Sequence, residues 1–245
     1  MTRIKAQYGV DSPGTIRKII TIGIILYVFG VLILPRFNAG AWMLYVDAAL
    51  VYTGIFLIIE GLLMIWYGKY GKLKHRDRIL GLFAFSGNER VLDIGAGSGL
   101  LAVGVASKLS SGRVTAIDLW QPQDLTDNTK NALLANARLE LVENKIEVLK
   151  AAVPGSGLPE ATYDLILSNR ALSRLNTPEL RKEACQEINL LLKDNGVAIL
   201  SDYRYMAHYM LLFHELGCQV EKIGTYLFST FPALTVIKVS KNGGA

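Results

Sequence analysis

The residues best suited to bind a ligand lie near the middle of the chain, in the glycine-rich segment Gly95-Ala96-Gly97-Ser98-Gly99. Glycines let the backbone approach a bound molecule, and the free amides of a following helix can face it. Asp93 stands two residues before this segment, and Asp118 stands nineteen residues after Gly99. A carboxylate at that place can accept hydrogen bonds from both ribose hydroxyls. These residues predict a nucleoside site, the alternative being a plain structural loop; the spacing is GxGxG, whereas a dinucleotide site prefers GxGxxG.

The elements that must position these residues alternate between strand-length and helix-length patterns. This alternation predicts a parallel sheet covered by helices. The glycine segment follows the first strand, Asp118 ends the second, and the final two strands have no helix between them. We predict strands at 90–94, 114–118, 145–149, 164–167, 197–201, 220–223 and 234–239, and helices at 76–83, 100–109, 128–139, 178–192 and 205–216.

From residue 76 to about residue 240 the sequence resembles the class I S-adenosylmethionine-dependent methyltransferases. The matching segments are residues 91–99, 116–118, 163–168 and 192–196, in that order. The resemblance implies an α/β, Rossmann-like, doubly wound and mostly parallel seven-stranded sheet whose last strand is antiparallel. It also implies S-adenosylmethionine as the cofactor.

The resemblance carries the family's cofactor-binding roles to particular residues of this chain. Gly95, Gly97 and Gly99 would form the turn beside the methionine and the ribose. Asp93 would lie near the amino group and Asp118 would hold the ribose hydroxyls. The full implied cofactor site is Asp93, Gly95, Ala96, Gly97, Gly99, Asp118, Leu119, Trp120, Ser168 and Asn169.

The remaining implied positions lie farther along the sheet. Leu119 or Trp120 would cover the adenine face, and Ser168 and Asn169 would line the pocket near the methyl acceptor. Many relatives carry an acid after the third strand that meets the adenine amino group, but this chain has Ala151-Ala152 there. The polar loop over residues 119–124, together with Asn128, is a candidate lid over the nucleoside.

No residue is identified as the catalytic base. The methyl group of a sulfonium is already electrophilic, so a base is needed only if the acceptor must lose a proton. Asp202, Tyr203 and His208 follow the fifth predicted strand, where an acceptor could sit, and each is also a candidate structural residue. Arg170 is a candidate for gripping an acidic substrate.

The first third of the chain is far more apolar than the rest. We predict two membrane-spanning helices at 19–36 and 43–67, joined by a turn over residues 35–40, because about 20 apolar residues cross a bilayer. The domains would then be an anchor at 1–75 and a methyltransferase domain at 76–245. Two alternatives are a pair of buried core helices and a signal peptide cut at Ala39-Gly40-Ala41. Glu60 lies deep in the second predicted span, and because a carboxylate facing lipid is costly, it should face the other helix, water or the globular domain; whether it has a role stays open.

Charge gives the expected orientation. Residues 1–78 carry a net charge of +6 and the remainder −1, so the basic character belongs to the apolar part. Basic residues flank both outer ends of the hairpin, which places both termini and the catalytic domain in the cytoplasm. Such a collar fits anionic lipid headgroups better than nucleic acid.

The predicted function is a membrane-anchored methyltransferase that uses S-adenosylmethionine and acts on a lipophilic or membrane-resident acceptor. The expected partners are the lipid bilayer and that substrate, without nucleic acid. The alternatives are a noncatalytic S-adenosylmethionine-binding or scaffold membrane protein, and a tethered nicotinamide oxidoreductase. Two cysteines and three histidines form no metal-ligand pattern, so we expect no metal. The acceptor atom and the oligomeric state are not given by the sequence.

Overall fold

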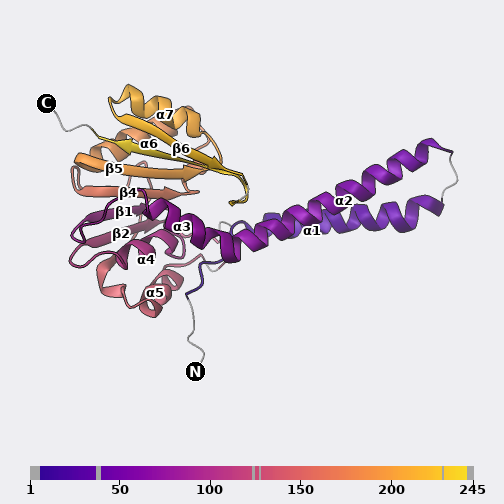
Figure 1. The fold of residues 1–245 in the computed structure, drawn as a ribbon, viewed down its shortest axis with the longest axis horizontal. Coiled ribbons are helices and arrows are strands. Elements are labelled where there is room, and N and C mark those ends of the chain that lie inside the picture. Colours follow the sequence, from indigo (N-terminus) through magenta and orange to yellow (C-terminus); the bar gives the residue numbers. More distant parts are fainter. Residues whose placement is uncertain (1–5, 37–39, 123–124, 127, 228, 242–245) are drawn as a thin grey trace.

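The computed structural model describes residues 6–36, 40–122, 125–126, 128–227 and 229–241. Figure 1 shows an α/β domain from which a long helical hairpin projects. Three residues of the predicted turn, 37–39, lie outside the described residues, and so does Ala39 of the alternative cleavage site. Residues 123 and 124 of the polar loop also lie outside them.

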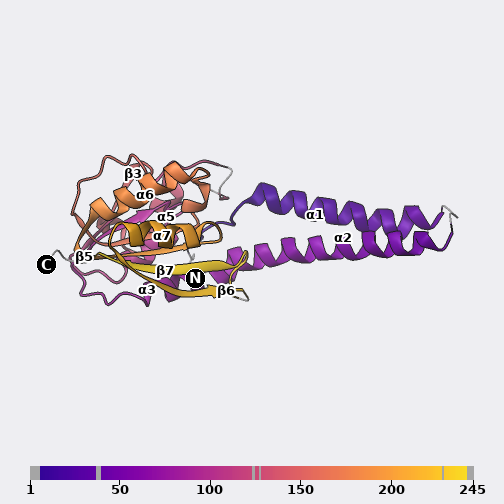
Figure 2. The same cartoon turned by 90° about the horizontal axis from the view of Figure 1, so that it is seen from above.

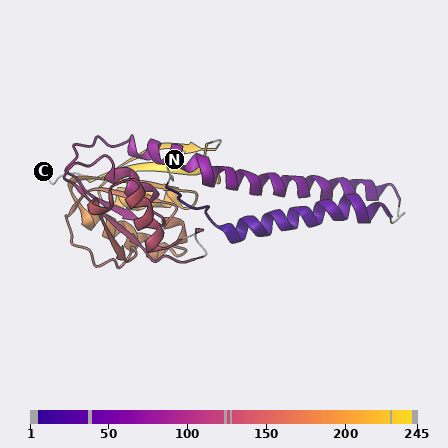
Figure 3. The same cartoon turned by 90° about the horizontal axis from the view of Figure 1, so that it is seen from below.

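The hairpin consists of two long apolar helices. The first is α1 (Pro13–Val28), which continues through the short turns η1 (Phe29–Ile33) and η2 (Leu34–Arg36), and the second is α2 (Trp42–Trp66). The first helix begins six residues before its predicted start because Pro13 is well suited to the first turn of a helix. Figures 2 and 3 show the two helices side by side along their length.

Glycines bring the two helices close together, while large apolar side chains face outward. A Cβ added to Gly54 would stand 2.7 Å from the carbonyl oxygen of Gly23, so the backbones touch where both residues lack side chains. Outward-facing residues include Leu44, Tyr52 and Phe56, each more than 60% exposed. Helices Pro13–Ile33 and Trp42–Leu80 are candidate membrane spans by length and composition, and only 17% and 11% of their most apolar windows are buried. A core helix of a soluble protein would be mostly buried, so the buried-core alternative is not favoured.

The second hairpin helix enters the domain without a break. After α2 the helix passes through a π-helical turn, η3 (Tyr67–Gly71), and becomes α3 (Lys72–Leu80). The predicted separate helix at 76–83 is therefore wrong in its start, because Gly68 and Gly71, in the basic segment before residue 76, do not end the helix. They make room for neighbours instead: a Cβ on Gly68 would touch Val10, and one on Gly71 would strike the ring of Tyr67. The predicted domain division at residue 75 stays a prediction.

The domain is built on a seven-stranded sheet in the order β3-β2-β1-β4-β5-β7-β6. All pairings are parallel except those of β7, which runs antiparallel to both β5 and β6. The strands are β1 (Arg90–Ile94), β2 (Arg113–Asp118), β3 (Ile146–Lys150), β4 (Tyr163–Asn169), β5 (Leu192–Asp202), β6 (Gln219–Tyr226) and β7 (Leu234–Ser240). The predicted fold class is confirmed; β5 begins at Leu192, five residues before its predicted start.

Helices cover both faces of the sheet. Residues of α3, α4 and α5 join one core cluster with Val91, whereas residues of α6 and α7 join the other with Leu92. Neighbouring residues of a strand point to opposite faces, which is why one strand supplies both cores. The remaining helices are α4 (Leu100–Ala106), α5 (Lys130–Leu139), η4 (Glu143–Lys145), η5 (Leu172–Arg174), α6 (Pro178–Leu191) and α7 (Met206–Glu215).

Candidate functional site

The glycine-rich segment forms a tight loop where β1 ends. Gly95 and Gly97 have φ of +74° and +53°, a conformation that side-chain-bearing residues rarely adopt. The amides of Gly95 and Ala96 donate to the carbonyl oxygen of Ile117 at 2.8 and 3.1 Å, which ties the loop to β2. A Cβ on Gly95 would collide with Ala171. The loop therefore keeps its shape only with glycine at these places.

Asp118 is held in place at the end of β2. Its Oδ2 accepts a hydrogen bond from the Gly97 amide at 2.8 Å, and its Oδ1 accepts one from the Trp120 amide at 2.6 Å. Each carboxylate oxygen can accept a further hydrogen bond. The side chain is thus fixed to receive two hydroxyl donors from the cavity beside it.

Asp93 is buried beneath the same loop, with 2% of its surface exposed. Its Oδ2 accepts a hydrogen bond from the amide of Ala102 in α4 at 2.8 Å. Burial raises the pKa of Asp93 to about 7; the charge of Asp118 adds to this, and the Ala102 amide opposes it. A cationic group beside Asp93 would favour its charged form. One amide in the first turn of α4 therefore donates to Asp93. The sequence had predicted that the amides of this turn face a ligand.

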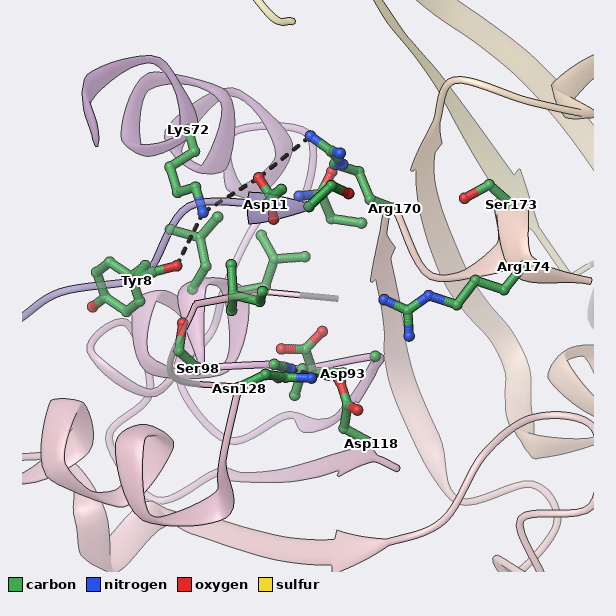
Figure 4. A pocket seen from close by; sticks show the side chains of 18 of the residues that line it. Tyr8, Asp11, Lys72, Asp93, Ser98, Asp118, Asn128, Arg170, Ser173 and Arg174 are labelled. Atoms are coloured by element: carbon green, nitrogen blue, oxygen red, sulfur yellow. Dashed lines mark hydrogen bonds and ion pairs between the residues drawn. The ribbon is translucent and has the colours of Figure 1, made fainter. Parts of the chain in front are cut away.

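A cavity of about 250 Å³, which we call the central cavity, opens at this edge of the sheet. Its walls are the glycine loop, the ends of β1, β2 and β4, an N-terminal segment and the start of α3. Figure 4 shows Asp93 and Asp118 on one side, with Lys72, Asp11 and Arg170 opposite them. The cavity thus has an acidic side, and a second side where cations outnumber acids.

Six of the ten predicted cofactor residues line the central cavity. They are Asp93, Gly95, Ala96, Gly97, Asp118 and Asn169. These six come from the ends of three neighbouring strands, β1, β2 and β4. The topology of the sheet, which the sequence predicted, is what brings them together.

The other four predicted residues lie behind or beside the cavity. Gly99 has φ of +90°, and a Cβ there would stand 2.9 Å from Leu133, so this glycine permits packing of α5. Leu119 is 43% exposed. Trp120 donates from Nε1 to the carbonyl oxygen of Gly97 at 3.0 Å and so braces the loop. Ser168 is buried one residue before Asn169. Their direct contact with a cofactor stays a prediction.

The buried oxygen atoms that have no hydrogen-bond partner among the described residues include Asn128 Oδ1, Ser168 Oγ and Asn169 Oδ1, and also the hydroxyl of Tyr8, a residue that lines the cavity. Asn128 and Asn169 line the cavity itself. The Asn128 Nδ2 donates to the carbonyl oxygen of Gln121 at 2.8 Å, so its amide has a fixed orientation. Burying a polar atom without a partner is costly, so these atoms mark places for hydrogen-bonding groups of a ligand.

The N-terminal segment forms a wall that local sequence patterns did not predict. Tyr8, Asp11 and Ser12 line the cavity. Val10 holds the segment there: its amide donates to Thr126 Oγ1 at 2.6 Å, and its carbonyl oxygen accepts from the Thr126 amide at 3.0 Å. These contacts join residues more than 100 positions apart, and no periodicity or spacing signals such a pairing.

Of the candidates for the acceptor side, Arg170 and Tyr203 reach the cavity. Asp202 is buried, and its two oxygens accept from the amides of Ser173 and Tyr203, both at 2.8 Å. Burial raises the pKa of Asp202. The Nδ1 of His208 accepts from Arg181 at 2.9 Å, away from the lining residues. Asp202 thus orients the loop after β4 and does not face the cavity.

Comparison with known proteins identifies this domain. A family model described as a methyltransferase domain matches residues 92–198. The chain therefore carries a methyltransferase domain. The match spans the glycine loop, Asp118 and the end of β4, which form part of the wall of the central cavity. The cofactor of such a domain is S-adenosylmethionine.

Curated relatives match parts of the methyltransferase domain. The chain is 38% identical over 96 residues to a tRNA1(Val) (adenine(37)-N6)-methyltransferase of Pedobacter heparinus, covering 38% of this chain and 37% of that protein. It is 30% identical over 137 residues to a malonyl-[acyl-carrier protein] O-methyltransferase of Geobacter sulfurreducens, covering 54% of this chain and 46% of that one. The chain thus spans less than half the length of these relatives.

Solved structures agree on the fold. An S-adenosylmethionine-dependent methyltransferase from Aquifex aeolicus superposes with a TM-score of 0.52 at 18% identity, over 69% of this chain and 90% of that one. At this identity the likeness concerns the fold of the methyltransferase domain.

The residues of the central cavity fit the cofactor's chemistry. S-adenosylmethionine presents ribose hydroxyls, an ammonium group and a sulfonium, which are donors or cations. The cavity is lined by groups that can accept hydrogen bonds or carry negative charge: Asp118, Asp93, and the oxygens of Asn128 and Asn169 that have no partner among the described residues. Donors meet acceptors and cations meet carboxylates, so the cavity is chemically matched to the cofactor.

Proposed function

We propose that this protein is a membrane-anchored methyltransferase that transfers a methyl group from S-adenosylmethionine to a lipophilic or membrane-resident acceptor. The observation that carries the proposal is the shared wall between the anchor and the cavity. Asp11 and Ser12 immediately precede α1, Lys72 begins α3, and all three line the central cavity. The ligand site therefore lies where the hairpin leaves the domain.

The helix that continues α2 is buried in the domain, which supports this proposal. Tyr67, Lys72, His75 and Ile79, on the helix that continues α2, are all less than 5% exposed. Lys72 Nζ donates to the carbonyl oxygens of Tyr8 and Gly9 at 3.0 and 2.8 Å. A helix locked into the domain in this way would hold the cavity at a fixed place relative to the bilayer.

The chemistry needs little more than binding and orientation from the protein. When bound, S-adenosylmethionine supplies an electrophilic methyl group, so the rate depends mainly on bringing the acceptor atom into line with it. Asp118 would hold the ribose and Asp93 would receive the ammonium group. Asn169 and Tyr203, which line the cavity, would lie toward the acceptor, and the N-terminal segment forms part of the cavity wall.

The activity is tested with full-length protein in lipid nanodiscs, S-adenosylmethionine labelled on its methyl group, and total membrane extract. We expect label in a lipid-extractable product, and none with the Asp118→Ala variant. Label only in water-soluble products would contradict a membrane-resident acceptor. Cofactor binding without turnover on any extract would favour the noncatalytic scaffold function instead.

The orientation is tested by cysteine labelling in intact cells. Lys69 and Lys74 belong to the basic collar at the domain end of the hairpin, which favours a cytoplasmic domain. A membrane-impermeant maleimide added outside should label Gly40→Cys, at the far end, and should not label Lys74→Cys. The two native cysteines are buried and provide little background. Labelling of Lys74→Cys from outside would reverse the proposed orientation.

A further inference from the structure

Two stretches of chain outside the matched family segment, residues 92–198, help to form the central cavity. Asp11 belongs to the N-terminal segment, residues 6–12, which leads into α1, and Lys72 begins α3, which follows α2. Figure 4 shows both side chains beside Arg170, which directly follows β4. The family match alone therefore does not account for this side of the cavity.

These three side chains together carry one net positive charge. Asp11 Oδ2 lies 3.3 Å from Arg170 Nη1 and 3.4 Å from Lys72 Nζ. The side chains of Arg170 and Lys72 are only 12% and 5% exposed, so water screens their charge poorly. A ligand that places a single negative charge beside them would neutralise the group.

Hydrogen bonding decides which cation can receive that charge. An ammonium group has three N–H donors. Lys72 Nζ directs two of them to the carbonyl oxygens of Tyr8 and Gly9, at 3.0 and 2.8 Å, and the third is taken up by the ion pair with the neighbouring carboxylate. A guanidinium has five donors in a planar fork, and the Arg170 pair with Asp11 involves Nη1, so donors on Nε and Nη2 remain for a ligand. Lys72 therefore fastens the N-terminal segment, and Arg170 is the cation that can bind an anion.

The backbone holds Arg170 in a strained conformation at this edge of the sheet. Its φ is +62°, which costs energy for a residue with a side chain. The Arg170 amide donates to the carbonyl oxygen of Ser201 in β5 at 2.8 Å, and Asp11 holds the guanidinium at the other end. Both ends of the residue are thus fixed, which limits the conformational entropy that it would lose on binding a ligand.

The amino-acid end of S-adenosylmethionine is a zwitterion, because one carbon atom carries both an ammonium group and a carboxylate. Asp93 lies on one side of the cavity and Arg170 on the other (Figure 4). A cavity with two oppositely charged walls matches such a group, and a guanidinium can bind a carboxylate through two parallel hydrogen bonds. The single negative charge of the carboxylate also equals the single net positive charge of Arg170, Lys72 and Asp11.

From this arrangement we infer that Arg170 binds the methionine carboxylate of S-adenosylmethionine and that Asp11 is the residue that positions it. The N-terminal segment thereby completes the cofactor site, so the chain that leads into the hairpin takes part in cofactor binding. The sequence suggested Arg170 for gripping an acidic substrate, whereas here its partner is the cofactor. The inference does not depend on the acceptor or on the bilayer.

The test compares two ligands by calorimetry on the full-length protein in detergent micelles. One is S-adenosylhomocysteine, and the other is decarboxylated S-adenosylhomocysteine, which keeps the amino group and lacks only the carboxylate. The native protein should bind the first at least about tenfold more tightly, because the second loses one charge-assisted ion pair. Equal affinity for the two ligands would mean that no cation of the cavity binds the carboxylate, and would overturn the inference.

Variants at two arginines locate the carboxylate. Arg170→Gln should abolish the preference by weakening S-adenosylhomocysteine alone, and Arg170→Lys should retain part of it, since lysine keeps the charge without the fork. Arg138→Gln, at an exposed arginine, is the control and should keep the full preference. If the preference persists in Arg170→Gln and disappears in Arg174→Gln, the carboxylate binds Arg174 and the inference is wrong. An equal loss of both ligands in Arg170→Gln would show a structural role alone and would also contradict it.

Asp11→Ala tests the positioning role, because charge alone predicts the opposite result. Removing a negative charge near the ligand carboxylate would by itself strengthen S-adenosylhomocysteine. If Asp11 positions Arg170, the variant should instead weaken this ligand about threefold or more and leave the decarboxylated ligand unchanged. A stronger affinity for S-adenosylhomocysteine would contradict the part assigned to the N-terminal segment. These measurements need no methyl acceptor, so a failure of the proposed function leaves their outcome unaffected.

Discussion

His75 Nε2 lies 2.8 Å from Ser201 Oγ, and this contact joins the helix that leaves the hairpin to strand β5. Both residues are buried. The carbonyl oxygen of the same Ser201 accepts the amide of Arg170, which lines the central cavity. Two hydrogen bonds thus connect the helix that continues α2 to Arg170 on the wall of the cavity.

Ser201→Ala should lower the free energy of unfolding by about 1–3 kcal/mol, because it leaves a buried imidazole nitrogen without its partner. Chemical unfolding in detergent micelles measures this loss. Ser111→Ala, an exposed serine, is the matched control and should change stability little. Equal effects of the two substitutions would argue against a structural role for the His75 contact.

Asp118→Asn should weaken S-adenosylmethionine about tenfold to a hundredfold. The carboxylate oxygens are oriented by two backbone amides, and an asparagine can offer only one oxygen to the ribose hydroxyls. Calorimetric titration gives the affinity directly, without needing the acceptor. Asp194→Asn, at an exposed aspartate, should leave the affinity unchanged.

Asn128→Ala should weaken S-adenosylmethionine by roughly threefold to tenfold, the effect of losing one ordinary hydrogen bond. Its Oδ1 is a buried acceptor on the cavity wall without a partner among the described residues. The same titration with Asn144→Ala, at an exposed asparagine, provides the control. An undiminished affinity in Asn128→Ala would mean that the cofactor does not use this oxygen.

Cofactor affinity should rise with pH between about 5 and 7. Burial raises the pKa of Asp93 to about 7, so below this pH the free protein holds a proton that the cationic cofactor must displace. Each pH unit below 7 should therefore weaken binding by up to about tenfold. Titrations across this range should show the slope in the native protein and its loss in Asp93→Asn. A flat profile in the native protein would place the ammonium group elsewhere.

Gly54→Ala should destabilise the hairpin by about 1–3 kcal/mol, because the new Cβ would stand 2.7 Å from two backbone atoms of α1. Gly14→Ala is the matched control, since a Cβ there meets nothing within 4 Å. Thermal unfolding in micelles measures the difference. Similar melting temperatures for the two variants would show that α1 and α2 do not need close contact.

The sequence predicted the sheet and the acidic side of the cavity because local patterns determine both. Strand-length apolar runs placed β1 and β2, and the spacing from Gly99 placed Asp118 at a strand end. Leu119 or Trp120 was predicted to cover the adenine face, and this stays a prediction. The hydrogen bond from the Trp120 indole nitrogen to the Gly97 carbonyl oxygen was not predicted, because it depends on side-chain packing, which residue spacing does not contain.

The opposite wall was beyond prediction for a different reason. Val10 forms a hydrogen bond with Thr126, and Asp11 forms one with Arg170, which lies 159 positions later in the chain. These contacts arise only after the sheet has brought distant segments together. The uninterrupted helix through residues 68–75 was missed because two glycines in a basic stretch suggest a linker, whereas here they fit against Val10 and Tyr67.

The uninterrupted helix Trp42–Leu80 fixes the distance between the apolar helix α2 and the central cavity. Lys72, on the cavity wall, comes six residues after the end of α2, or about 9 Å along the helix axis. A helix of this kind does not swing as a flexible linker would, so with α2 in a bilayer the active site works at nearly constant height. The site would then act on substrates whose reactive atom lies at that same distance from the hydrocarbon core of the bilayer.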